Sequence, residues 1–433
     1  MAAPPPPRGL ADLAALPSLE AKAAAYAAHL DAALEEASAA TASAAAGASG
    51  PAAGSVATAY ALLAHLADPD AVTLSLSRSL LSAFAAKLET LATVSRDAAK
   101  LLAKEALERI GPRRVSFEEQ LASIREALAG MHEADEEWAD AARCLAGIDL
   151  DSGVRAVDDD YKLATCVRIA MLYLEDDDAV NAETHVKRAS FLLASRDNDV
   201  AAAAGADDAK YRALELQYKV CYARVLDAKR RFLEAAMRYY ELSQLPSTGG
   251  GAAGTPRVDD AELVQALEAA VACAVLAAAG PQRSRVLATL YKDERTSRLP
   301  SFAILERVHL GRFLQPDAVA AFAATLKPHQ LAQAADGSTV LSRSVVEHNI
   351  VAASMVYRCI ALDALGALLG VAPRVAEKAA GTMIFERRLN AHLDQAAGVL
   401  RFDHDDGAKA SWDSTIANLC GATTAIVASL DPL

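Results

Sequence analysis

The stretch that decides the fold is residues 354–403, SMVYRCIALDALGALLGVAPRVAEKAAGTMIFERRLNAHLDQAAGVLRFD. The sequence before it has the periodicity of consecutive helices, whereas this stretch contains both strand and helix signals. Its predicted order is strand, helix, turn, helix, strand, strand. That order is typical of a winged helix, so the sequence predicts a winged-helix module at residues 341–403.

Local signals place the elements of this module. Gly370 is suited to the left-handed position that stops a helix, and Pro373 is suited to the first turn of the next one. Residues 395–398 form the predicted wing between the last two strands. The predicted elements are a strand at Tyr357–Ile360, helices at Leu362–Leu369 and Pro373–Arg388, and strands at Leu389–Asp394 and Val399–Asp403.

The long segment before the module, residues 10–340, is predicted to be a helical-repeat arm. The 433-residue chain is 53% apolar but only 5% aromatic, and it is rich in alanine. Such a composition suits closely packed helices, because small side chains let neighbouring helices approach. We therefore expect a mainly α protein, with a right-handed tetratricopeptide-like solenoid of degenerate repeats. Ordinary helical bundling remains the alternative.

Several stretches lack the large apolar residues that a packed core needs. The proline run at residues 1–9 has no basic segment followed by an apolar one, so it is predicted to be disordered and not a secretory signal. Surface loops are predicted at three low-complexity stretches: Ala37–Ala57, Ala201–Asp208 and Ser247–Arg257.

The last segment, residues 404–433, is predicted to be a single helix with an apolar stripe. Its apolar side chains recur at alternating steps of four and three residues, as in the seam of a helical bundle. We expect this stripe to dock among partner helices; the alternative is that it folds back on the winged helix. The stripe consists of Trp412, Ile416, Leu419, Thr423, Ile426 and Leu430.

Charge and composition argue against some partners. The formal net charge of −13 opposes general binding to nucleic acid or anionic membranes. The second winged-helix helix, Pro373–Arg388, carries a mild excess of positive charge without interleaved aromatic residues, so a nucleic-acid-binding factor is the weakest reading. No apolar run is long enough to span a bilayer.

No catalytic or metal-binding residues are predicted, and no cofactor is expected. The six cysteines are scattered, and no two histidines stand at the spacing of a zinc isopeptidase site. The chain also lacks a nucleophile elbow and a phosphate-binding glycine loop. Acidic clusters such as Asp403 with Asp405 and Asp406 fall at predicted element ends, where solvated turns are expected.

Short segments in a constant order resemble a known family. They are EEWA at 136–139, GID at 147–149, LYKDER at 290–295, KPHQ at 327–330, ADGS at 335–338, VEHN at 346–349, and Trp412–Cys420. These segments resemble the fourth subunit of the COP9 signalosome, within the PCI-domain scaffolds. The resemblance runs from about residue 117 to residue 420.

The resemblance implies a non-catalytic scaffold subunit. In that family the complex removes NEDD8 from cullins, and a different, zinc-bearing subunit performs the hydrolysis. The implied partners are the other PCI and MPN subunits, and the cullin and RING protein of cullin-RING ligases. Cytoplasmic and nuclear localisation is expected. The alternative within this class is the related PCI subunit of the 26S proteasome lid.

Two docking surfaces follow from this reading. PCI scaffolds assemble edge to edge through their winged-helix strands, which would make the last strand an edge available for sheet extension. The residues expected there are Val399, Leu400 and Phe402. The residues expected in the shared helical bundle are Trp412, Ile416, Leu419, Ile426 and Leu430.

Overall fold

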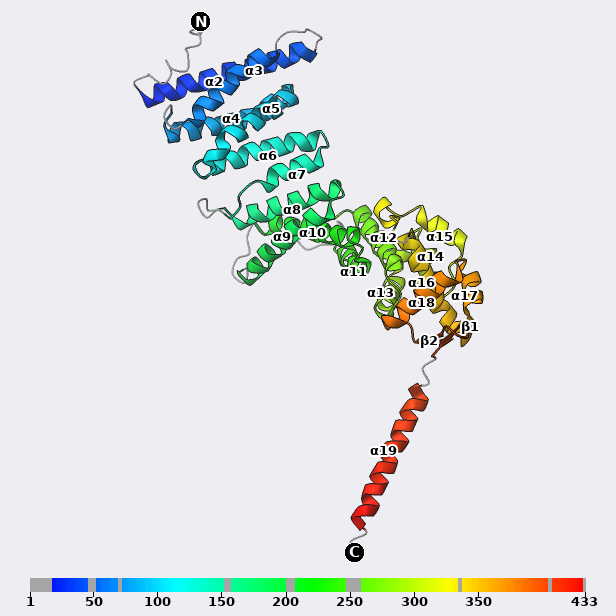
Figure 1. The fold of residues 1–433 in the computed structure, drawn as a ribbon. Coiled ribbons are helices and arrows are strands. Elements are labelled where there is room, and N and C mark those ends of the chain that lie inside the picture. Colours follow the sequence, from blue (N-terminus) through cyan, green and yellow to red (C-terminus); the bar gives the residue numbers. More distant parts are fainter. Residues whose placement is uncertain are drawn as a thin grey trace. The chain divides into compact units, whose positions relative to one another are not determined.

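The computed structural model describes residues 18–45, 52–68, 72–151, 157–199, 207–246, 258–333, 337–403 and 407–430. The chain divides into two compact units, residues 1–225 and 226–433, and this division falls inside the segment predicted as one arm. Both units are dominated by helices, with a small sheet in the second (Figure 1).

The first unit is built from helices that pack against their neighbours in sequence (Figure 1). The helices are α2 (Leu19–Ala45), α3 (Ala52–Ala67), α4 (Leu74–Val94), α5 (Arg96–Ile110), the 3₁₀ helix η1 (Gly111–Ser116), α6 (Glu118–Ala134), α7 (Trp138–Ala146), α8 (Asp159–Glu175), α9 (Ala179–Asp199) and α10 (Asp207–Ala228), which crosses the division.

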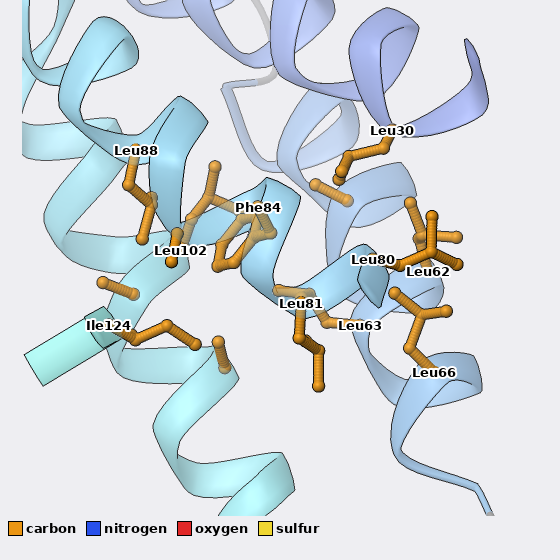
Figure 2. Close-up of a cluster of buried hydrophobic side chains, with 14 of the residues drawn as sticks. Leu30, Leu62, Leu63, Leu66, Leu80, Leu81, Phe84, Leu88, Leu102 and Ile124 are labelled. Carbon is orange, nitrogen blue, oxygen red and sulfur yellow. The ribbon is translucent and has the colours of Figure 1, made fainter. Parts of the chain in front are cut away.

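Leucine-rich faces of these helices form the core of the first unit (Figure 2). Leu81 and Phe84 of α4 are fully buried, and α5 presents Ala99 and Ala103 to the same cluster, also fully buried. Because alanine occupies so little space, α5 can approach α4 and α6 closely. The predicted use of alanine at helix contacts is therefore confirmed here.

One turn geometry recurs between paired helices. Glu136, Asp177 and Arg230 each have a positive φ, between 59° and 61°. After each, the next amide donates back over the helix end, as in Glu137 N to His132 O at 2.9 Å and Asp178 N to Tyr173 O at 2.8 Å. These turns are 41 and 53 residues apart, an irregular spacing close to the interval of a helical-hairpin repeat.

The predicted bounds of two of the low-complexity loops are wrong, because helices extend into both stretches. Helix α2 continues to Ala45 and α3 begins at Ala52, both within the stretch 37–57. Helix α10 likewise begins at Asp207, within 201–208. Alanine is the best helix former, so a lack of large apolar residues does not prevent a helix. The rest of these stretches, the third predicted loop and the predicted disordered start lie outside the described residues: 46–51, 201–206, 247–257 and 1–9.

The second unit continues with helices and ends in the winged helix and one further helix. Its helices before the sheet are α11 (Phe232–Ser243), α12 (Asp260–Leu276), α13 (Pro281–Lys292), η3 (Glu294–Arg298), α14 (Phe302–His309), α15 (Pro316–Ala323), η4 (Pro328–Gln330) and α16 (Val340–Val356). The remaining elements are β1 (Cys359–Ala361), α17 (Leu362–Leu369), α18 (Pro373–Phe385), β2 (Ala391–Asp394), β3 (Val399–Phe402) and α19 (Gly407–Leu430).

The predicted order of the winged helix is confirmed within a few residues. Gly370 has φ 67° and ends α17, and Pro373 opens α18. Helix α18 ends at Phe385 rather than Arg388, because the positive φ of Arg387 turns the chain toward β2. Buried residues of α16, α17, α18 and the sheet share one core, which includes Ile350, Leu365, Met383 and Leu400.

The prediction that Val399–Phe402 is an edge strand is wrong. The strand order is β1-β3-β2, so β3 is hydrogen-bonded on both sides and the edges are β1 and β2. Leu400 and Phe402 are buried because their side chains face the core that the sheet shares with the helices. The pairing of the distant strand β1 with β3 displaces β3 from the edge.

Candidate interaction surfaces

The sheet of the winged helix offers two unpaired strand edges among the described residues. Along β1, Arg358 O and the amide of Leu362 are hydrogen-bonded to residues at the two ends of β3. Because successive residues of an antiparallel strand point their backbone groups to opposite sides, the amides of Cys359 and Ala361 point outward. On β2, Asn390 O accepts from Asp403 N, and the amide of Leu393 faces outward by the same alternation. A neighbouring strand could extend the sheet at either edge.

Helix α19 exposes the predicted apolar stripe. Trp412, Ile416, Leu419 and Ile426 are 69%, 48%, 66% and 58% exposed. Every described side chain of α19 is exposed. Leu430 belongs to the helix, but its side chain lies outside what the structure describes.

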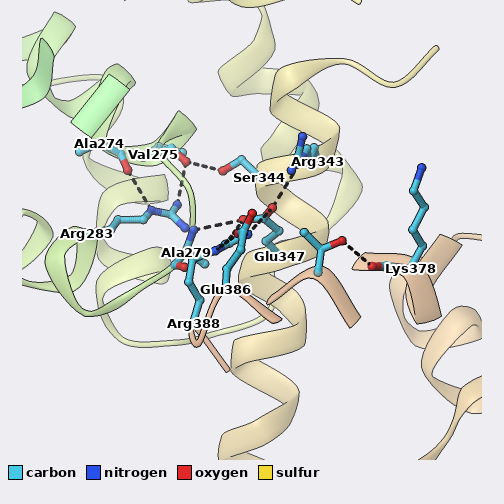
Figure 3. A network of polar contacts seen from close by, with 11 residues as sticks. Ala274, Val275, Ala279, Arg283, Arg343, Ser344, Glu347, Lys378, Glu386 and Arg388 are labelled. Carbon is cyan, nitrogen blue, oxygen red and sulfur yellow. Dashed lines mark hydrogen bonds and ion pairs between the residues drawn. The ribbon is translucent and has the colours of Figure 1, made fainter. Parts of the chain in front are cut away.

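The segment VEHN, residues 346–349, is an internal anchor. Glu347 is 4% exposed and forms a two-pronged ion pair with Arg388 (Figure 3), with Nη1 to Oε2 at 2.6 Å and Nη2 to Oε1 at 3.2 Å. The same carboxylate accepts from Ala279 N at 3.2 Å. Burial raises the pKa of Glu347, but the hydrogen bonds and charge of Arg388 outweigh it, so the pKa lies below its usual value.

The next two residues hold the backbone before α15. His348 Nε2 lies 2.9 Å from Arg312 O. The side chain of Asn349 forms two hydrogen bonds with the backbone of Leu314: it accepts from the amide at 2.9 Å and donates to the carbonyl at 3.3 Å. Burial lowers the pKa of His348 to about 4, so the ring is neutral at pH 7. These contacts fix the chain and present no reactive group.

Two more family-like segments form similar anchors. In LYKDER, Arg295 donates to Asp293 and to Ser243 O, which ties η3 to the end of α11. In KPHQ, the Gln330 amide donates to both carboxylate oxygens of Asp227, at 3.0 and 3.1 Å. Asp227 is 1% exposed, and its partner stands 103 residues away. Sequence spacing gives no signal for such a pair.

A cluster that could resemble a metal site is an ion-pair network. Ligand atoms of His132, Glu137 and Asp140 lie within 4.8 Å of one another. Glu137 already binds Lys100 Nζ at 2.6 Å and His132 Nδ1 at 2.5 Å, and the hydrogen bond from Lys100 lowers its pKa. Glu137 is therefore already paired with two groups of the chain, and Asp140 is bound by Arg143.

Part of the positive charge predicted for the second winged-helix helix forms ion pairs within the chain. Arg388, one of the cations counted toward nucleic-acid reading, is bound to Glu347 and Glu386. Glu377 accepts from Gln395 of the wing at 2.6 Å. Phe385, at 88% exposure, is an apolar residue on the outer side of this helix. None of the described helices is long and apolar enough to cross a membrane.

Comparisons with known proteins agree with this architecture. The family described as PSMD12/CSN4, N-terminal, matches residues 69–249, and the PCI domain matches residues 322–404. COP9 signalosome complex subunit 4 of Arabidopsis thaliana is 49% identical over 358 residues, which is 83% of this chain and 85% of that protein. The chain belongs to the COP9 signalosome subunit 4 family.

Two further relatives carry the same description. The Drosophila melanogaster subunit 4 is 42% identical over 82% of this chain and 81% of its own length. The Dictyostelium discoideum subunit 4 is 40% identical over 87% of this chain and 88% of its own length. The N-terminal match covers both PSMD12 and CSN4, so it is these relatives that separate the signalosome family from the alternative of the proteasome lid.

Proposed function

We propose that this chain is a non-catalytic scaffold subunit of the COP9 signalosome. The observation that carries the proposal is the uncovered apolar stripe of α19, in a chain whose relatives are named as subunits of that complex. Large apolar side chains aligned on one helix face favour burial against partner helices, at about 25 cal/mol per Å² removed from water. The bundle residues are Trp412, Ile416, Leu419, Ile426 and Leu430.

The winged helix supplies a second contact in this proposal. Neighbouring PCI subunits extend the sheet at β1 and at β2, in place of the edge first expected at β3. Outward amides at Cys359, Ala361 and Leu393 would donate to the added strands. This arrangement gives the chain one neighbour on each side.

The finer role is to help hold the cullin and its RING partner and to communicate with the zinc-bearing subunit that removes NEDD8. The polar residues of the family-like segments support a structural role, since Glu347, Asn349 and Gln330 are buried and bonded within the chain. The complex would act in the cytoplasm and the nucleus.

Affinity purification of the full chain from its own cells tests membership. We expect the other PCI and MPN subunits of the signalosome to co-purify in equal amounts. Recovery of proteasome-lid subunits, or of the chain alone, would contradict the proposal.

A further inference from the structure

A surface cavity lies in the second unit, between α16 and α18. Its volume is about 210 Å³, below the range of about 300–1,000 Å³ that is usual for small-molecule sites. A cavity of this size can take one side chain of a larger partner. Its lining residues come from the start of α16, from the turn between α17 and α18, and from α18 itself.

The floor of the cavity is apolar and belongs to the core of the winged helix. Val346, Val371 and Ala379 line the cavity and pack against the buried cluster that includes Ile350 and Met383. All three lining residues are only partly buried, so they still present apolar surface to water. An apolar side chain that entered the cavity would remove this surface from water, which favours binding.

The rim of the cavity carries positive charge from both helices. Arg343 of α16 and Lys378 of α18 line it, and their side chains extend to the same side (Figure 3). Arg343 is 60% exposed, and its hydrogen bond to Glu347 at 3.3 Å uses Nε, so both terminal nitrogens can donate to a carboxylate. Among the described residues that line the cavity, Glu347 is the only acid, and Arg388 already binds it through two hydrogen bonds.

Exposed apolar side chains continue the groove along α18. Val375 lines the cavity and is 52% exposed. Phe385 is 88% exposed and stands seven residues after Lys378, which places it two helical turns further along the same side of α18. A small anion would leave these side chains in water, whereas an acidic segment with an apolar face would contact both them and the cations.

We propose that the groove between α16 and α18 binds an acidic amphipathic helix of a partner protein. One apolar side chain of that helix enters the cavity, a neighbouring carboxylate binds Arg343, and further apolar residues cover Val375 and Phe385. The inference goes beyond the scaffold role proposed above, because it uses neither the stripe of α19 nor the edges of the sheet.

Fluorescence anisotropy of the full chain tests this site with a labelled helical peptide that has leucines on one face and glutamates on the other. Arg343→Gln should weaken binding about tenfold, as for the loss of a charge-assisted hydrogen-bonded pair. Arg374→Gln is the matched control, because it removes the same charge from an exposed residue of α18 that does not line the cavity. This control should bind the peptide as the wild-type chain does.

Apolar substitutions test the cavity and the groove separately. Ala379→Leu places a larger side chain in the cavity and should block binding. Phe385→Ala should weaken binding, whereas Phe191→Ala, which removes a phenylalanine that is 75% exposed on α9 of the first unit, should not. Arg343 and Phe385 are exposed, so the melting temperatures of their variants should match that of the wild-type chain.

Several results would overturn the proposal. They are failure of the wild-type chain to bind the glutamate peptide, equal binding of a peptide with lysine in place of glutamate, and equal loss with Arg374→Gln or Phe191→Ala. Unchanged binding by Ala379→Leu would also overturn it, because the cavity would then not hold the anchoring side chain. Displacement of the peptide by duplex DNA at equal concentration would assign a nucleic-acid surface instead, and that too would overturn the proposal.

Discussion

Arg388, just beyond α18, binds the buried carboxylate of Glu347 on α16 through two hydrogen bonds, Nη1 to Oε2 at 2.6 Å and Nη2 to Oε1 at 3.2 Å. Arg388 Nη1 also donates to Ala279 O at 3.0 Å, in the turn between α12 and α13. One side chain therefore connects the winged helix with the helices that precede it in the second unit (Figure 3). Nearby, Arg283 donates to Ala274 O and Val275 O.

Loss of Arg388 should destabilise the second unit. Arg388→Ala would leave the buried Glu347 carboxylate with only Ala279 N and the exposed Arg343 as partners, so we expect the free energy of unfolding to fall by about 3 kcal/mol. Arg343→Ala is the control: Arg343 is 60% exposed and 3.3 Å from the same carboxylate, and its loss should cost less than about 1 kcal/mol. Urea unfolding of the full chain measures both, and equal losses would contradict this role for Arg388.

His348 should make stability fall with acidity. Its folded-state pKa of about 4 lies below the usual histidine value of about 6.5, so the unfolded chain takes up the proton first. The contribution of the neutral ring is fully present above about pH 6.5 and is lost as pH falls toward 4, by roughly 2 kcal/mol between pH 7 and pH 5.

A non-titrating variant isolates this effect from that of the carboxylates. His348→Gln keeps a donor for Arg312 O, and it should reduce the drop in unfolding free energy between pH 7 and pH 5. An unchanged slope in the variant would show that His348 is not the titrating group.

The stripe of α19 should be needed for assembly and not for folding. Ile416→Asp with Leu419→Asp places charges where partner helices would exclude water, which costs several kcal/mol, so co-purification with other subunits should be lost. Both side chains are exposed in the chain itself, so its melting temperature should not change. The control variant Ala417→Asp with Asn418→Asp adds the same charge away from the stripe and should still co-purify with the other subunits. If co-purification were lost in both double variants, the added charge and not the stripe would be the cause.

The sheet edges can be separated by proline. Leu393→Pro removes an outward amide of β2 and should weaken contact with one neighbouring winged helix. Because Leu393 also packs against the core, Leu393→Ala, which keeps the amide, is the comparison for the lost side chain. His392→Pro removes an amide that faces β3, so it should lower stability itself. A pull-down with the neighbouring subunit and a melting curve distinguish the two. An unchanged pull-down with Leu393→Pro would place that neighbour elsewhere.

Local signals predicted the winged-helix elements well. Gly370 and Pro373 fix helix ends through their own backbones, so their effect is visible without a partner. The stripe of α19 was also found from periodicity alone. The edge strand was missed, because strand order depends on where β1 pairs across the whole module.

The internal anchors were beyond sequence reasoning for the same reason. Glu347 and Arg388 are 41 residues apart, and Gln330 and Asp227 are 103 apart. No sequence pattern in either member of a pair indicates its partner. The contact between Gly147 of the GID segment and the Arg125 side chain was missed too, because the two residues lie on different helical elements.

Native mass spectrometry of complexes purified through this chain, with an assay of the eluate on neddylated cullin, tests the central claim most directly. The account predicts a multi-subunit signalosome that contains this chain and removes NEDD8, and the loss of both the assembly and the activity when Ile416 and Leu419 carry aspartate. A chain that is recovered alone, or an assembly that leaves the neddylated cullin intact, would contradict it.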